Sequence, residues 1–219
     1  SYKDVVSRFT VKPRPLSHNM RISGGVFGLL GGLRQTSAVS FVMQGRNWLR
    51  IEQAENIGNI AKRRYAGADV QLRIPNRKGV TELRAEYMYG LQTGTARSSE
   101  TPGTLPVETN GSFSALYTRP FDGAYFYWLQ HLGSAHHQFI LKYDWYDPNT
   151  AVRGREIGEG FTGADVRYDT WGFGYIYYVN AHLKIVNCYE WVRNEKTSLR
   201  EVSRDLKDNL FTCRLQYRF

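Results

Sequence analysis

The chain has 219 residues and a formal net charge of +9, from 29 Lys and Arg against 20 Asp and Glu. No run of five or more basic residues occurs, so the concentrated patch of a nucleic-acid-binding protein is missing and no nucleic-acid partner is expected. The longest apolar runs are a few residues, far below the roughly 20 that a membrane-spanning helix needs.

Aromatic residues and glycines favour strands over helices throughout the chain. There are 15 Tyr, 11 Phe, 5 Trp and 21 Gly, and aromatic side chains are enriched in strands. Alternating segments predict about nine strands, at residues 4–12, 20–30, 63–74, 80–92, 123–132, 137–147, 164–179, 183–194 and 209–219. The chain is therefore expected to be all-β.

The connections between these strands alternate in length. Short turns are expected at residues 13–19, 75–79, 133–136 and 180–182, and long loops near 33–60, 93–122, 148–163 and 195–208. Antiparallel strands in chain order would collect the short turns at one end and the long loops at the other. Outer-membrane barrels have this pattern, with short periplasmic turns and long outer loops. A soluble β-sandwich or a lipocalin-like barrel is the alternative.

The two sides of each strand differ in polarity. In the strand around residues 81–91, Leu83, Tyr87 and Tyr89 share one side, and Arg84 and Glu86 share the other. A soluble barrel would turn the apolar side inward, whereas a porin turns it to the lipid. Large aromatic residues near strand ends and strands of ten or more residues fit a tilted bilayer crossing. We therefore expect an antiparallel transmembrane β-barrel.

Cations recur on the polar sides of these strands. The expected pore-lining set is Arg8, Lys12, Arg73, Arg84, Lys142, Arg167, Lys184, Arg214 and Arg218. Rings of Arg and Lys lower the barrier for anions in pores, and arginine suits bidentate contact with phosphate or carboxylate. The alternative is ordinary solvation of a wide lumen, in which nearby Asp and Glu residues balance the cations.

Patterns for catalysis, cofactors and metals are missing from the sequence. There is no GxSxG, no GxGxxG leading into a helix, no Walker lysine and no EF-hand spacing. Cys188 and Cys213 have opposite parities on neighbouring strands, so both are expected to be free thiols. We expect no enzyme, no cofactor and no metal site; a barrel enzyme is a distant alternative.

The last segment, DNLFTCRLQYRF (208–219), alternates up to a terminal aromatic residue. It resembles the C-terminal signature by which bacterial outer-membrane barrels are recognised for assembly, here carried by Tyr217 and Phe219. Residues 136–150, 164–195 and 208–219 resemble, in order, the last strands of the phosphate-selective porin O/P family. The segments SRFTVKP (7–13), GGVFGLLGG (24–32) and residues 65–94 resemble the strands before them.

The resemblance implies a sixteen-stranded, trimeric barrel in the bacterial outer membrane, of which residues 1–219 would be the C-terminal part. It implies contact with outer-membrane lipid and lipopolysaccharide, the barrel-assembly machinery, two further copies in a homotrimer, and small anionic solutes. The expected function is a passive diffusion channel that favours anions such as phosphate. The alternative is a non-transporting structural barrel in an envelope complex.

Overall fold

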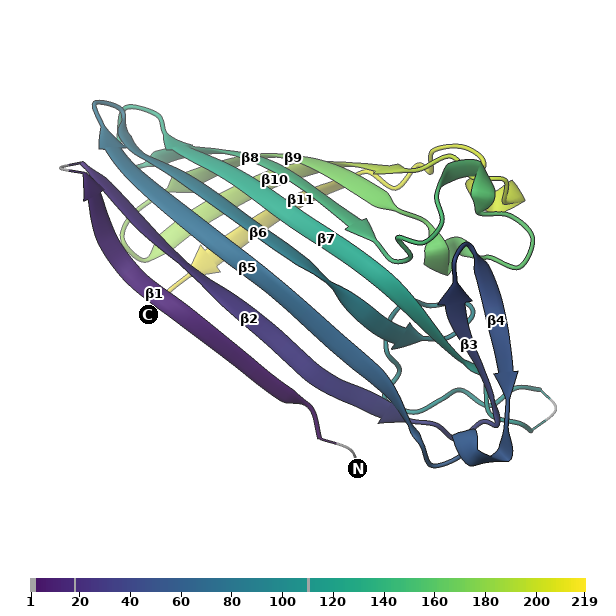
Figure 1. Cartoon of the computed structure of the whole chain (residues 1–219). Helices are drawn as coiled ribbons and strands as arrows, with labels where there is room; N and C mark the ends of the chain where they lie inside the picture. Colours follow the sequence, from purple (N-terminus) through teal and green to yellow (C-terminus); the bar gives the residue numbers. More distant parts are fainter. Residues whose placement is uncertain (1–2, 18, 110) are drawn as a thin grey trace.

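A single curved sheet dominates the computed structural model, which describes residues 3–17, 19–109 and 111–219 (Figure 1). Its strands are β1 (Val5–Ser17), β2 (Met20–Arg34), β3 (Val39–Gln44), β4 (Asn47–Glu52), β5 (Ile60–Asn76), β6 (Gly79–Gly94), β7 (Leu116–His131), β8 (His137–Asp147), β9 (Tyr168–Tyr178), β10 (Leu183–Asn194) and β11 (Leu210–Tyr217). Short 3-10 turns η1 (Ala54–Asn56), η2 (Gly154–Glu156), η3 (Gly163–Asp165) and η4 (Arg200–Val202) complete the assigned elements. Within the described ranges, no helix has the length and apolar character needed to cross a membrane.

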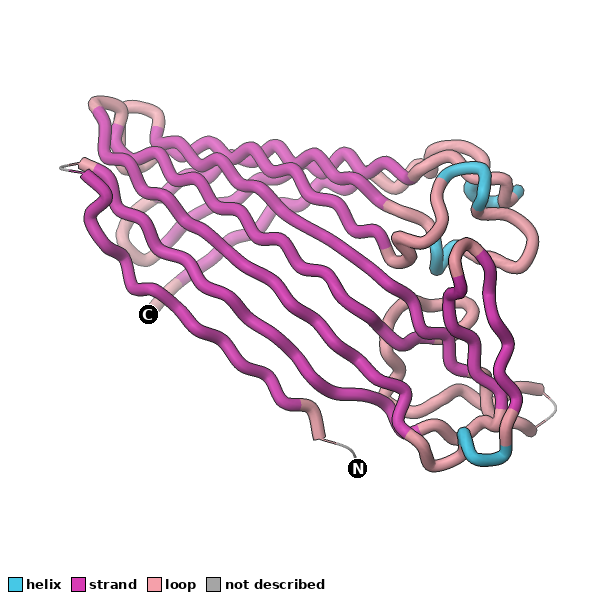
Figure 2. The backbone as a smooth tube through the Cα atoms, viewed as in Figure 1, coloured by secondary structure: helices cyan, strands magenta, loops and turns pink. Residues whose placement is uncertain are grey.

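Nine strands follow each other in space in the order β1-β2-β5-β6-β7-β8-β9-β10-β11, and each pairs antiparallel with the next. This confirms the all-β antiparallel fold expected from the sequence. The short turns lie at one end of the sheet and the long connections at the other (Figure 2). We call these the turn end and the loop end. The sheet bends into a trough (Figure 1), and within the described residues β1 and β11 each pair with one other strand.

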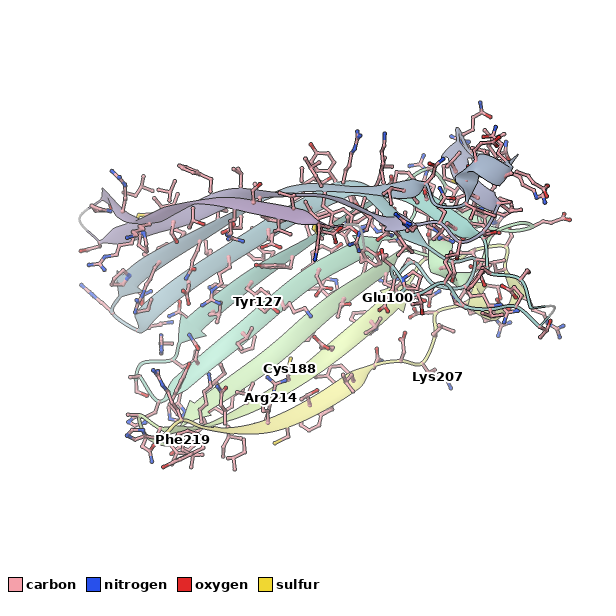
Figure 3. All side chains as sticks on the ribbon, turned by 90° about the horizontal axis from the view of Figure 1, so that it is seen from below. Glu100, Tyr127, Cys188, Lys207, Arg214 and Phe219 are labelled. Carbon is pink, nitrogen blue, oxygen red and sulfur yellow. The ribbon has the colours of Figure 1, made fainter. Side chains whose placement is uncertain are left out.

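The alternating pattern gives the sheet two unlike faces. On β6, Arg84 and Glu86 lie on the concave side, here called the inner face, whereas Tyr87 and Tyr89 lie on the convex outer face. Figure 3 looks into the trough and shows Tyr127, Cys188 and Arg214 on the inner face. The sheet's outer face is left uncovered: Tyr89 is 54% exposed.

The buried apolar clusters lie at the loop end and not between layers of sheet. One consists of Val152, Ile157, Val166 and Val202. A soluble sandwich would bury one whole face of the sheet, whereas lipid-facing strands keep their apolar side chains on the outside. The exposed outer face therefore fits a membrane barrel.

Several expected boundaries were wrong, including the end of β2 at Arg34 and the start of β5 at Ile60. The turn expected at residues 13–19 is shorter, because β1 continues to Ser17. The strand accommodates Pro13 and Pro15 where its register shifts, between Val11 and Arg14 and between Pro15 and Ser17. Strand β7 begins at Leu116 and not at residue 123. Strand β9 begins at Tyr168 and not at 164, because η3 occupies the preceding residues.

The expected loop near 33–60 contains a folded hairpin. Strands β3 and β4 pair antiparallel, and β3 also pairs in parallel with the start of β7, with Ser40 opposite Leu116 and Val42 opposite Thr118. The pairing of β7 with β8 begins only at Asp122. Strand β3 therefore covers an edge of β7 that would otherwise leave its backbone groups unpaired.

The backbones of β5 and β6 approach each other closely at Gly90, and this contact tests the register of that strand pair. A Cβ atom at Gly90 would overlap the carbonyl oxygen of Arg64 on β5, so Gly90→Val should destabilise the barrel by about 1–3 kcal/mol through overpacking. The measurement is the fraction of full-length protein in the outer membrane that stays folded in SDS without heating. Gly103→Val is the control, because a Cβ atom at Gly103 would point into open space. Equal folded fractions for the two variants would contradict the register.

Candidate pore wall

Lys142 is the centre of the charged network on the inner face. Its Nζ atom lies 2.8 Å from an oxygen of Asp144 on the same strand and 2.7 Å from an oxygen of Glu190 on β10. Gly172 of β9 lies between Lys142 and Glu190 in register. Because Gly172 has no side chain, the lysine stem crosses over it and reaches the acid two strands away.

Further ion pairs extend this charged network towards β1. Arg8 lies 2.5 Å from Asp69, and Arg84 lies 3.0 Å from Glu82. Glu86 receives a hydrogen bond from the Tyr125 hydroxyl at 3.3 Å. Exposed pairs of this kind contribute about 0–1 kcal/mol to stability. Their main effect here is to neutralise most of the acids on the wall.

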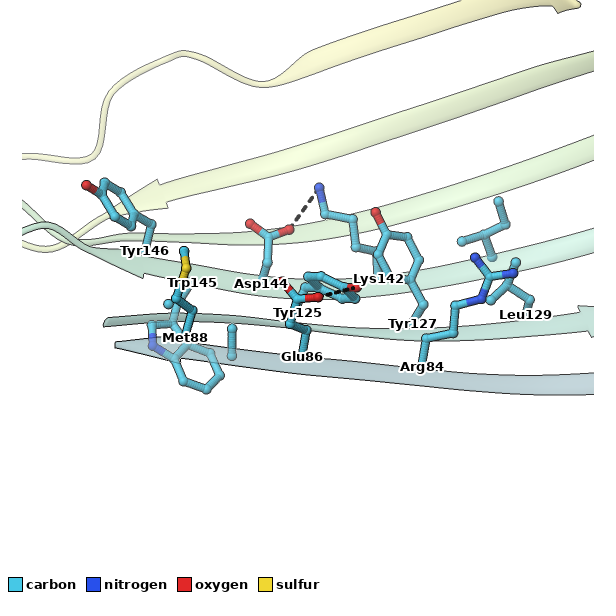
Figure 4. Close-up of a pocket in the computed structure, with 13 residues that line it drawn as sticks. Arg84, Glu86, Met88, Tyr125, Tyr127, Leu129, Lys142, Asp144, Trp145 and Tyr146 are labelled. Carbon is cyan, nitrogen blue, oxygen red and sulfur yellow. Dashed lines mark hydrogen bonds and ion pairs between the residues drawn. The ribbon is translucent and has the colours of Figure 1, made fainter. Parts of the chain in front are cut away.

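A hollow of about 690 Å³ lies on the inner face over β6, β7 and β8. Figure 4 shows Tyr125, Tyr127, Lys142 and Asp144 pointing to the same side of the sheet, towards the distant strands, while Trp145 points away from them. The hollow therefore combines hydroxyl groups, aromatic rings and paired charges. Such a surface can hydrogen-bond a hydrated solute.

Four inner-face cations lack an acidic partner. Arg21, Arg73, Lys184 and Arg214 form no ion pair with any residue that the structure describes. They lie near the turn end: Arg21 and Lys184 are each the second residue of a strand, and Arg73 is close to the end of β5. Arg21 and Arg73 are direct cross-strand partners. This end of the wall therefore has uncompensated positive charge.

Arg21 was missing from the set expected from the sequence. It lies inside the strand expected at residues 20–30 and has the parity of Gly25 and Phe27, which pair with the inner-face residues Asp69 and Gly67, so alternation along that strand would have included it. Lys12 lies where the register of β1 shifts, between Val11 and Arg14. Arg218 follows β11, and its carbonyl oxygen lies 2.9 Å from Nδ1 of His182.

Arg167 is not on the inner face, and its expected position needs correction. Its guanidinium lies 5.7 Å from the ring centre of Trp145 and 2.9 Å from Asp169, which accepts a hydrogen bond from the Tyr143 hydroxyl. These aromatic residues belong to the outer face. The physical reason is strand parity, since Arg167 is four residues before Trp171 and shares its side of the strand. Cation–π contact and an ion pair then satisfy the charge.

The two cysteines and the terminal aromatics lie as their parities predict. Cys188 and Cys213 are free, with Cys188 opposite Thr212 and Cys213 opposite Asn187, which confirms the free thiols. Tyr217 and Phe219 are exposed, with ring centres 6.4 Å apart. Their role as an assembly signal stays a prediction. Among the described residues, no three His, Cys, Asp or Glu side chains form a group that could hold a metal ion.

Comparison with protein families matches residues 118–219 to the family described as phosphate-selective porin O and P. The match confirms the expected resemblance over this part of the chain, and with it the bacterial outer membrane as the location. It suggests a channel rather than an enzyme.

Among solved structures, a mutant ferric enterobactin receptor from Pseudomonas aeruginosa matches with a TM-score of 0.48 and 12% identity. The alignment covers 98% of this chain and 30% of the receptor chain, so this chain spans less than a third of that protein. A search of curated proteins found no match.

The Lys142 network provides a test of the wall. Lys142→Met should destabilise the barrel by about 1–3 kcal/mol, because Asp144 and Glu190 would lose the cation that both of them contact. Thermal or denaturant unfolding of the full-length protein in detergent measures the effect. Lys184→Met is the matched control, because Lys184 contacts the Tyr178 ring and no acid. If both variants unfold alike, the network adds nothing to stability.

Proposed function

We propose that this chain is part of an outer-membrane porin that lets small solutes diffuse passively and favours anions. The observation that carries the proposal is the imbalance on the inner face. Asp69 and Glu82 each pair with an arginine, and Asp144 and Glu190 share Lys142, whereas Arg21, Arg73, Lys184 and Arg214 form no ion pair with any described residue. The net field of such a wall is positive, and it lowers the barrier for anions in the lumen.

Three of the four unpaired cations were among the expected pore-lining residues, and all four lie on the turn-end half of the wall. In a porin the short turns face the periplasm, so we place the anion-favouring field at the periplasmic side of the pore. Phosphate and other small oxyanions are the proposed solutes, since guanidinium groups can contact them with two hydrogen bonds.

A complete barrel needs more strands than this sheet provides. In lipid, the unpaired backbone groups of β1 and β11 would have no water to bond, so further strands must pair with both edges. We propose that these belong to the same type of sixteen-stranded, trimeric barrel that the porin family implies. Lipopolysaccharide and the assembly machinery are the proposed envelope partners.

The second candidate function is a structural barrel without transport, and an open lumen distinguishes the two. Planar-bilayer recordings of the full-length protein should show ion current with anion-favouring reversal potentials in a salt gradient. No current at any voltage or salt concentration would favour the structural role.

Replacing the unpaired cations tests the source of selectivity. A variant with Arg21, Arg73, Lys184 and Arg214 all changed to Gln should lose most of its preference for anions. The loss should be largest at low ionic strength, where charges are least screened. The reversal potential of the full-length pore in a salt gradient is the measurement.

Arg167→Gln is the matched control for this experiment, because its guanidinium lies beside Trp145 on the outer face. It should leave the reversal potential unchanged. A pore that prefers cations before any substitution would overturn the proposed anion preference, and an equal shift from Arg167→Gln would remove the wall cations as its source.

A further inference from the structure

Arg119 of β7 has the parity of an inner-face cation but not its surroundings. It lies opposite Gln92 in register and shares the side of β7 to which Phe121 and Tyr125 belong, the inner side. Yet its side chain is only 1% exposed, compared with 46% for Arg84 on the same face. Strand alternation alone would count Arg119 among the pore-lining cations, but burial separates it from the solute path.

The guanidinium of Arg119 contacts three different connections of the loop end. Its Nε atom donates a hydrogen bond to Oδ1 of Asp165 at 2.8 Å, and its Nη1 donates to the carbonyl oxygen of Thr95 at 2.9 Å. The guanidinium also lies 5.1 Å from the ring centre of Trp48, on β4. Asp165 belongs to the β8–β9 connection, Thr95 to the β6–β7 connection and Trp48 to the β2–β5 connection.

Asp165 is equally buried, and both of its carboxylate oxygens are engaged. Oδ1 also accepts a hydrogen bond from Nδ2 of Asn149 at 2.9 Å, and Oδ2 accepts one from the backbone of Thr162 at 3.0 Å. The side chain is 1% exposed. The Asp165 carboxylate therefore stabilises the fold of the β8–β9 connection and also holds the Arg119 side chain in place.

Neighbouring contacts continue the same assembly of loops. Phe41 of β3 stacks on Tyr117 of β7, with ring centres 4.4 Å apart. The apolar cluster of Val152, Ile157, Val166 and Val202 joins the β8–β9 connection to the β10–β11 connection, and Met43 packs against it. All four long connections thus meet in one packed region, with the Arg119–Asp165 ion pair inside it.

We infer that the Arg119–Asp165 ion pair holds the four long connections together as one folded unit at the loop end of the sheet. We call this unit the cap. Arg119 is a positioning residue for this cap and not a member of the anion path. Removing one partner of a buried pair leaves the other charge without its countercharge and without water. The cap should then open locally while the strands below it stay paired.

The experiment compares Arg119→Met with Arg84→Met in the full-length protein in intact cells. Trypsin should cut the Arg119 variant at least about tenfold faster than the unchanged protein, at exposed cap residues such as Arg50 and Arg155. The Arg84 variant should be cut at the unchanged rate, since Arg84 lies on the same face but outside the cap. In bilayers the Arg119 variant should show more open-channel current noise.

A second variant distinguishes the ion pair from simple packing. Changing Asp165 to Asn together with Arg119→Met removes both charges, and it should slow cleavage at least about threefold relative to Arg119→Met alone. If Arg119→Met does not reach the membrane, Asp165→Asn alone should show faster cleavage of the cap.

Unchanged cleavage in the assembled variant would overturn the inference, as would equally fast cleavage after Arg84→Met or no slowing in the double variant. The noise measurement rests on the proposed channel function, whereas the cleavage comparison does not. A full-length protein without current would therefore contradict the channel and leave the cap to be decided by trypsin.

Discussion

Backbone hydrogen bonding is the constraint on which the rest of this structure depends. A strand in lipid has no water to pair with, so each N–H and C=O group must find a partner on a neighbouring strand. The nine-strand meander meets this requirement between β1 and β11 by joining each strand to the next in chain order. Once the hydrogen bonds between neighbouring strands are fixed, each strand side chain lies on either the inner or the outer face, because successive side chains of a strand point to opposite faces.

The position of the charges follows from the same hydrogen bonds between strands. Lys142 reaches Glu190 only because Gly172 stands between them in register, and the outer aromatic residues stay uncovered because lipid takes the place of a second sheet. The acids of the inner face have nearby cations, with Glu86 held by Tyr125 instead. The excess of positive charge on the inner face thus depends on where the strand register places each charged residue, and not only on the net charge of the chain.

Much of this architecture could be predicted from period-two alternation and connection length. Nine strands, their order and the two ends of the sheet required no information beyond local sequence. Arg167 was misplaced although alternation alone was sufficient, because it has the parity of Trp171 and therefore belongs to the outer face. The β3–β4 hairpin was missed because its pairing partner, β7, lies far away in the sequence. Burial of Arg119 depends on contacts from three separate connections, so alternation within β7 could not reveal it.

The parallel contact between β3 and β7 has a consequence for the order of folding. Residues 40 and 116 pair although two long strands, β5 and β6, lie between them in the chain. Contacts of such large sequence separation form slowly, because the entropy of closing a long loop must be overcome first. Neighbouring strands of the meander can pair as local hairpins. The β3–β4 hairpin can pair with β7 only after β7 has joined the sheet. The loop end is therefore completed late in the folding of the barrel.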